Sequence, residues 1–447
     1  MGLGDLVLAQ ILCVVGSSWV GVAAKLGRAH ALFWLIAIFL FYLPLAAVVI
    51  CLSRRIPLEG GLYRWAQQGF GDFLGFLTAW NLLVYAIINV PSILYVLPTD
   101  LYYLIGPSAD WLPESHTAVA SIIFTAALVI SLFAIRGLGA AKWLHNIGSV
   151  LICLAYVLLL SLPLLAVWNG HPRPYTPFPI QRPALSWFSL AIFGQITVGG
   201  LSGFEYVAIM AGECRGASRT IARSVWLSAP IIALMFILGT SSVLAFVGNA
   251  PINLIGPIPQ TFSLAFGASG WGSALARFGI FLLLVRAVAS ASLIFTGLTR
   301  LPMTAGWDHL LPDWFSRLHP AWKTPVNSIL FMTAMLALLL LLSMLGVRAQ
   351  ETMQLLLNAS DVHYGITYVA LFALPLFSAP AFRSGLPPWL RVVSLAGLLS
   401  SLIAVCIAIY PIVGVSSRLS YAAKIAGAVL LSNLLGVIVY RSRRKPV

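Results

Sequence analysis

Four ionisable side chains stand inside long apolar stretches of this sequence, where charge is rare: Glu205, Arg286, Asp361 and His363. If these stretches cross a membrane, each of the four side chains needs a charged partner or a polar cavity. Ionisable groups at that depth commonly mark the path of a substrate, an ion or a proton. We therefore take Glu205, Arg286 and Asp361 as candidate coupling or gating residues.

Helical spacing separates these candidates. One polar face of a helix is predicted by side chains that recur three or four residues apart, namely Asn358, Asp361, Tyr364 and Tyr368. Asp361 on this face either lines a cavity or remains in the protein interior. His363 is two residues from Asp361 and points elsewhere, which favours a packing role. Glu205 is either a proton site or a structural hydrogen-bonding group for broken backbone.

Arg286 lies about midway along its apolar segment, too far from either end to extend its charge into water. An unpaired arginine at this depth costs several kcal/mol. Ser290 is one turn further on and shares the face of Arg286. Arg286 is therefore either a fixed positive charge with a functional role, acting beside Ser290, or half of a buried structural ion pair.

Three glycines within five residues interrupt the segment just before Glu205: Gly199, Gly200 and Gly203. Each glycine costs a helix interior about 1 kcal/mol, so a break in the helix is predicted. Broken backbone is tolerated in a membrane where it is buried in protein or lines a wet cavity. Close packing of helices through small residues is the alternative interpretation.

A second interruption, at Gly16, Ser17 and Ser18, lies in the middle of the first apolar segment. Interrupted helices at corresponding positions of two halves of a chain are typical of a transporter binding site. Exposed backbone N–H groups at one break attract an anion, and exposed carbonyls at the other attract a cation. A zwitterion such as an amino acid satisfies both.

The segments that carry these residues dominate the composition. Of 447 residues, 60% are hydrophobic and 9% are charged, and the mean hydropathy is +0.97. The apolar runs are continuous rather than alternating, which indicates membrane-spanning helices and excludes a β-barrel. We predict an all-α integral membrane protein with twelve transmembrane helices, at 4–24, 31–52, 73–97, 117–135, 146–168, 186–211, 224–248, 271–297, 325–346, 352–378, 389–413 and 421–440.

The net charge of +14 is explained by topology rather than by nucleic acid. With the N-terminus in the cytoplasm, 17 of the 26 lysines and arginines fall on the inner side, 7 on the outer side and 2 within the membrane. The positive-inside rule then places both termini in the cytoplasm, in a multi-pass protein of the plasma membrane. The basic end at 441–447 is a topology signal, with a lipid or partner contact as the alternative.

Short loops leave no room for a soluble domain. The longest polar insertion, near 169–186, contains five prolines and is predicted to be stiff and non-helical. We predict a first five-helix half at 1–168, a proline-rich external loop at 169–185, and a second five-helix half at 186–378. Two further helices and the basic tail occupy 379–447.

No pattern of an enzyme or a metal site is found. The five cysteines, at positions 13, 51, 153, 214 and 406, lack metal or redox spacing. No phosphate-binding loop, metalloprotease motif or Ser-His-Asp order is present. We therefore expect no catalysis, no cofactor, no metal and no nucleic-acid partner. The expected partners are the lipid bilayer, a small-molecule substrate and protons.

Three blocks of the sequence resemble one known family. They are EGGLYRWAQQGFGDFLGFLTAW (59–80), GGLSGFEYVAIMAGECRGASRTIARSV (199–225) and GLTRLPMTAGWDHLLPDWFSRLHPAWKTPV (297–326). In these blocks and their order, the chain is similar to the amino acid–polyamine–organocation (APC) permeases over nearly its whole length. The resemblance implies the leucine-transporter fold, in which two inverted five-helix repeats hold substrate between helices 1 and 6, with helices 3, 8 and 10 lining the site.

The resemblance also implies which residues bind substrate. It assigns the carboxylate to Gly16, Ser17 and Ser18, and the ammonium to carbonyls around Gly199, Gly200 and Leu201, with Ser202 and Gly203 beside them. Phe204 would be an aromatic lid. The chain departs from the family at Cys51, where many relatives carry an acidic residue.

A second departure concerns a positive charge. The stretch 146–156 lacks the lysine that stands in for a sodium ion in some relatives. The resemblance brings the face of Arg286 near the break in the first helix. We therefore hypothesise that Arg286 supplies this charge, held by carbonyls of the first helix, Glu205 or Asp361, and that transport is independent of sodium.

Together these features predict a secondary active transporter of amino acids or similar small amines, working by alternating access with proton coupling (symport) or exchange (antiport). The candidate pocket positions offer few unpaired charges, which favours neutral or apolar substrates. The alternative is a non-transporting membrane sensor built on the same fold.

Overall fold

The computed structural model describes residues 2–56, 60–205, 216–267, 270–307, 311–343 and 349–443. Within these ranges every regular element is a helix, and no strand occurs. The α-helices are α1 (Leu3–Val14), α2 (Ser17–Ala24), α3 (His30–Ala37), α4 (Leu43–Arg55), α5 (Leu62–Phe70), α6 (Asp72–Leu94), α7 (Val96–Ile105), α8 (His116–Arg136), α9 (Leu138–Trp168), α10 (Trp187–Gly194), α12 (Ala217–Val247), α13 (Pro257–Phe266), α14 (Gly270–Leu298), α15 (Arg300–Trp307), α16 (Val326–Ser343), α17 (Ala349–Phe377), α18 (Pro380–Arg383), α19 (Trp389–Ile407) and α20 (Arg418–Arg443). The described ranges also contain two π-helical segments, η2 (Ile38–Tyr42) and η4 (Gln195–Gly200). Three short 3-10 turns are present as well, namely η1 (Gly27–Ala29), η3 (Pro107–Ala109) and η6 (Asp313–Ser316).

Apolar helices of membrane-spanning length make up most of the described chain. Eight helical stretches in the described ranges are long and apolar enough to cross a bilayer, and α1 and α2 form a ninth if they are taken as one span bent by 45°. Each of the twelve predicted segments overlaps a helix, including the shorter apolar stretches Trp187–Gly200 and Val326–Leu341. The protein is therefore a multi-pass membrane protein.

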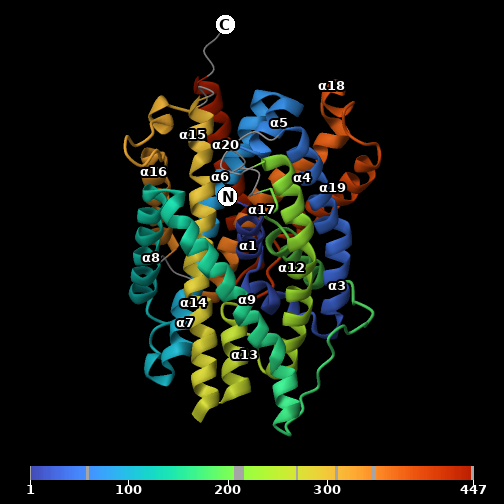
Figure 1. The fold of residues 1–447 in the computed structure, drawn as a ribbon, viewed down its shortest axis with the longest axis vertical. Helices are drawn as coiled ribbons and strands as arrows, with labels where there is room; N and C mark the ends of the chain where they lie inside the picture. The colour runs from blue at the N-terminus through green and yellow to red at the C-terminus, as the bar shows by residue number, and fades with distance from the viewer. Residues whose placement is uncertain are drawn as a thin grey trace.

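The long helices run along the long axis of the molecule (Figure 1), and several short helices lie near its ends. The helices α5, α15 and α18 lie at the upper end of the view, and α13 lies in its lower half. The upper group contains Arg64, Arg300 and Arg383, three arginines that the sequence assigns to one side of the membrane. The predicted external loop at 169–186 contains no helix and runs as an extended trace along the lower right of the view.

The first predicted span is broken where the sequence predicts a break. The helix α1 ends at Val14 and α2 begins at Ser17, with Gly16 in extended backbone at φ −97° and ψ 136°. A side chain at Gly16 would not fit, because its Cβ would lie 2.7 Å from the Trp19 ring. The break brings the unsatisfied carbonyls of one helix end close to the unsatisfied N–H groups of the next.

The second predicted break is also present. The helix α10 continues as η4 to Gly200, and the chain at 201–205 is not helical. The remainder of the predicted segment, 206–211, lies outside the described residues. Gly203 has φ +119°, a value that glycine adopts at little cost and that other residues resist. The π-helical segment η4 ends directly before this break. Because π-helical turns are frequent at functional sites, its position agrees with a functional role for the break.

Burial separates an inner from an outer group of helices. Large apolar side chains are exposed on α8, α9 and α20, for example Leu132, Val157 and Leu430. This is expected for helices in contact with lipid. All eight residues of α2 are buried, and the side chains of η4 are also mostly buried. The two broken helices therefore lie in the protein interior, where polar groups can be enclosed.

Candidate functional site

A cavity lies between the two breaks. Its volume is about 50 Å³, on a measure in which one water molecule needs roughly 10 to 15 Å³. Five segments contribute to its wall: α1 with α2, α6 with α7, the end of η4 with the residues after it, α14 and α17. The lining residues are Cys13, Val14, Gly16, Ser17, Ser18, Trp19, Tyr85, Asn89, Ser92, Ile93, Val96, Gly199, Ser202, Gly203, Arg286, Ser290, Ile294, Met353, Leu357 and Tyr364.

The residues predicted for the first break all lie on this cavity. Gly16, Ser17 and Ser18 form the start of α2. No side chain caps this helix end, so its first N–H groups remain available to a ligand. The partial positive charge of a helix N-terminus favours an anionic group at this point.

The end of α1 is held by side chains from α14. Ser290 donates its hydroxyl hydrogen to the Leu12 carbonyl at 3.0 Å. The Arg286 guanidinium donates through Nη2 to the Val15 carbonyl. These carbonyls belong to the last turn of α1 and the residue after it, where cations and donors are favoured. Arg286 is thus attached to the first helix, one of the three partners named from the sequence.

Arg286 is only 5% exposed, and its Nε has no hydrogen-bond partner among the described residues. Neither Glu205 nor Asp361 forms an ion pair with it in the described part of the chain. Asp100 of α7, a helix that packs against α14, is a second buried ionisable side chain in this part of the fold and is 3% exposed. The described hydrogen bond of Arg286 goes to the helix terminus and not to a carboxylate.

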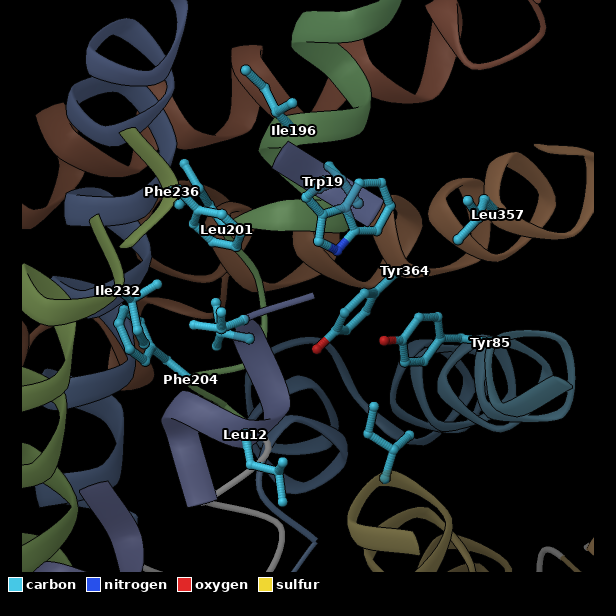
Figure 2. Close-up of a cluster of buried hydrophobic side chains, with 14 of the residues drawn as sticks. Leu12, Trp19, Tyr85, Ile196, Leu201, Phe204, Ile232, Phe236, Leu357 and Tyr364 are labelled. Atoms are coloured by element: carbon cyan, nitrogen blue, oxygen red, sulfur yellow. The ribbon is translucent and has the colours of Figure 1, made fainter. Parts of the chain in front are cut away.

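Glu205 follows the second break and is connected to the cavity through tyrosines. Its Oε1 accepts hydrogen bonds from the hydroxyls of Tyr364 and Tyr368, the second at 2.8 Å. The Tyr368 hydroxyl in turn accepts from the Gly203 N–H at 3.1 Å. Tyr364 lines the cavity and stacks on Tyr85 with ring centroids 3.9 Å apart, as Figure 2 shows. Glu205 is therefore linked to the cavity wall by the hydrogen bond that Tyr364 donates to it.

Asp361 lies directly behind the cavity wall. Both of its carboxylate oxygens lack a hydrogen-bond partner among the described residues, although the side chain is 5% exposed. A methyl group built on Gly199 would lie 2.8 Å from Asp361 Oδ2 and 2.3 Å from the Trp19 ring. Gly199 and Trp19 both line the cavity, whereas Asp361 does not. The carboxylate thus lies beside two residues of the cavity wall, Gly199 and Trp19.

The polar face of α17 is formed as predicted. Asn358 accepts from Gln195 Nε2 at 2.8 Å and donates to the Tyr421 hydroxyl at 2.9 Å. His363 lies on another face. Its Nδ1 lies 2.8 Å from Asn81 Oδ1 and its Nε2 lies 3.1 Å from Ser432 Oγ. Because both ring nitrogens are paired within the protein, the packing role predicted for His363 is supported.

Three residues assigned to the substrate site do not reach the cavity. Gly200, Leu201 and Phe204 are absent from its lining. The Phe204 ring stacks on Tyr42 with centroids 4.7 Å apart, and Figure 2 shows it on the side of Ile232, away from Tyr364. The chain turns at Gly203 and directs the next side chain away from the cavity. The structure therefore does not place Phe204 as the aromatic lid.

Two functional candidates escaped the sequence analysis. Trp19 is the aromatic side chain that lies over both breaks, with its indole nitrogen directed towards Tyr364 in Figure 2. Its position directly after the small residues of the first break was the sequence feature that could have identified it. Asp100 was assigned to a loop because the apolar run ends near position 97, whereas α6 and α7 continue to Ile105 and bury it.

Comparison with known proteins agrees with this architecture. The profile of the amino acid permease family matches residues 4–431. The chain belongs to this family. As such, the permease is a membrane transporter, and its family is the one that the sequence blocks resemble.

Individual relatives of the permease are distant. It is 24% identical over 334 residues to an uncharacterized transporter of Legionella pneumophila, with 73% of this chain and 69% of that protein covered. It is 24% identical over 295 residues to the low-affinity putrescine importer of Escherichia coli K12, covering 63% of this chain and 61% of the importer. It is 21% identical over 339 residues to the methylthioribose transporter of Bacillus subtilis, covering 72% of this chain and 70% of that transporter. The matched region thus spans about 60 to 70% of these relatives.

Proposed function

We propose that this permease is a secondary active transporter that moves amino acids or related small amines by alternating access. The observation that carries the proposal is the cavity between the two helix breaks, in which the N-terminus of α2 and the segment after η4 face one another. A helix N-terminus binds a carboxylate, and carbonyls at the end of a broken helix bind an ammonium group. One small zwitterion satisfies both requirements, and a small amine satisfies the second.

The proposed architecture is the one that the sequence resemblance implies. Residues 1–168 and 186–378 form two inverted five-helix repeats, 169–185 form an external loop, and 379–447 add two helices and the basic tail. Twelve spans place both termini in the cytoplasm of a cell whose plasma membrane holds the protein. The overlap of every predicted span with a helix supports this arrangement.

In the proposed binding mode, substrate carboxylate lies at Gly16, Ser17 and Ser18. The amino group lies at the opposite break, with Gly199, Ser202 and Gly203 on the cavity wall. We expect Trp19, rather than Phe204, to act as the aromatic lid, since its ring contacts the backbone at both breaks.

We further propose that uptake needs no sodium and is driven by protons or by exchange. Arg286 places a permanent positive charge at the end of α1. Ser290 holds the neighbouring carbonyl and keeps that helix end in place. A group that stays charged does not carry the proton, so Glu205 and Asp361 are the residues proposed for proton coupling or gating.

Uptake into proteoliposomes tests the proposal. Purified protein reconstituted without sodium should accumulate at least one radiolabelled amino acid or small amine, either with a proton gradient or in exchange for unlabelled substrate inside. The compounds are chosen beforehand from a thermal-shift screen of the twenty amino acids and common polyamines. Binding without any flux under both conditions would instead support the sensor interpretation.

A further inference from the structure

Asp361 is the buried group that the proposed binding mode does not use. Its two carboxylate oxygens are unpaired among the described residues. Within the described ranges, no lysine, arginine or histidine forms a salt bridge with it. A buried carboxylate is stable when a cation or donors meet it. Asp361 is therefore a buried carboxylate that has neither a cation nor a hydrogen-bond donor beside it among the described residues.

The seam between η4 and α17 has the same deficiency. Gln195 donates to Gln354 and Asn358 through Nε2, which leaves Gln195 Oε1 unpaired. The unpaired atoms of this seam are the donor Gln354 Nε2, the Thr197 hydroxyl, which can donate or accept, and three acceptor oxygens on Asp361 and Gln195. This excess of acceptors favours a ligand that brings hydrogen-bond donors and positive charge.

The cavity wall next to Asp361 is thin. Gly199 has no side chain to stand between the cavity and the carboxylate, since a Cβ there would lie 2.8 Å from Oδ2. The Trp19 ring lies at the same point, 2.3 Å from that Cβ position. A rotation of this ring away from Gly199 would connect Asp361 with the cavity. The face of the same indole is also a favourable surface for an ammonium group.

We propose that Asp361 forms a second subsite, which binds the distal cationic group of the substrate, and that Trp19 opens and closes it. The substrate class is then an amine with a second positive charge, such as a diamine or a basic amino acid. This inference rests on the proposed transport function and narrows its substrate. It gives Asp361 a substrate-binding role in place of the coupling role proposed above, which leaves Glu205 as the residue proposed for coupling. It differs from the neutral or apolar substrate expected from the sequence, because Asp361 places an unpaired carboxylate beside the pocket.

The test compares ornithine with norvaline, which has the same carbon skeleton but lacks the terminal ammonium group. Both are measured as competitors of uptake in proteoliposomes holding the full-length protein. The wild type is expected to bind ornithine at least tenfold more tightly than norvaline. Asp361→Asn should lower the affinity for ornithine at least tenfold and leave that for norvaline within twofold. Asp72→Asn, an exposed aspartate of α6, is the matched control and should change neither affinity.

Each outcome bears on the proposal. A wild type that transports norvaline and does not prefer ornithine overturns the subsite, while the proposed transport function stands. Equal losses for both compounds in Asp361→Asn also overturn it and assign Asp361 to coupling or structure. If Asp361→Asn does not fold, the wild-type preference between ornithine and norvaline still decides. Transport of no amino acid or amine at all overturns both the subsite and the proposed function.

Discussion

Replacing Arg286 tests how the site holds its fixed charge. The guanidinium is buried, and its one assigned hydrogen bond is to the Val15 carbonyl at the break between α1 and α2. Hydrogen bonds to charged groups contribute about 1.5 to 3 kcal/mol, which corresponds to roughly 10- to 150-fold in an equilibrium constant. Arg286→Ala removes this bond and the charge together. We expect uptake to fall by about that factor.

Arg286→Lys separates charge from geometry. Lysine keeps the positive charge but lacks the planar guanidinium fork, and its shorter reach weakens the contact with Val15. Partial uptake is therefore expected, between the values of the wild type and Arg286→Ala. Arg277→Ala is the control, because Arg277 lies on the same helix with an exposed side chain. This control should transport as the wild type does.

The assay is initial-rate uptake into proteoliposomes, with sodium replaced by choline in one series. Wild-type uptake should be the same in both series. The expression level and the size-exclusion profile of each variant show whether loss of uptake reflects loss of folded protein. Normal uptake by Arg286→Ala, or strong stimulation of the wild type by sodium, would refute the idea that Arg286 takes the place of a sodium ion.

Four further changes probe the remaining parts of the site. Gly203→Val should abolish uptake without preventing membrane insertion, because a β-branched residue resists φ +119°; normal uptake by this variant would contradict a requirement for the break. Glu205→Gln should flatten the pH dependence of uptake and affect exchange less than net uptake, since its charge is fixed at zero; an unchanged pH profile would assign Glu205 to structure. Trp19→Ala should weaken substrate binding by about tenfold or more, whereas Trp19→Phe should retain most of it because an aromatic ring remains; equal binding by both would remove Trp19 as a lid. Asp100→Asn and Arg286→Ala should lower the melting temperature non-additively when combined if the two side chains, both buried on the packed helices α7 and α14, are coupled; additive effects would show that they are independent.

Apolar periodicity made the helices and their two breaks predictable. Runs of apolar residues identified twelve segments that each overlap a helix, since a bilayer requires about twenty such residues in sequence, whereas the short helices α5, α13, α15 and α18 lie outside these runs. Glycines and serines at 16–18 and 199–203 marked the breaks because small residues are costly inside a helix without a special reason. Both signals are local in the chain, so they needed no knowledge of how the helices pack.

Contacts between segments far apart in the chain were harder to predict from the sequence. Phe204 and Trp19 are both aromatic residues next to a break, and the backbone turn at Gly203 decides which of them faces the cavity. The bond from Ser290 to Leu12 joins residues far apart in the chain, and its existence depends on the rotation of α14. The face of Asp361 was readable from helical spacing, but its position behind Gly199 was not.

The buried charges differ in how they are held, and this difference suggests separate roles. Arg286 is fixed to the end of α1 and stays protonated, so it sets the electrostatic background of the cavity. Glu205 is fixed by two tyrosine hydroxyls that donate to the same oxygen, which ties any change in its charge to the cavity wall through Tyr364. Asp361 is held by no described partner. Glu205 Oε2 and Arg286 Nε are also unpaired, but each of these side chains has at least one described hydrogen bond, whereas Asp361 has none and gains the most from a ligand. For this reason we assign the response to substrate charge to Asp361 and the constant charge to Arg286.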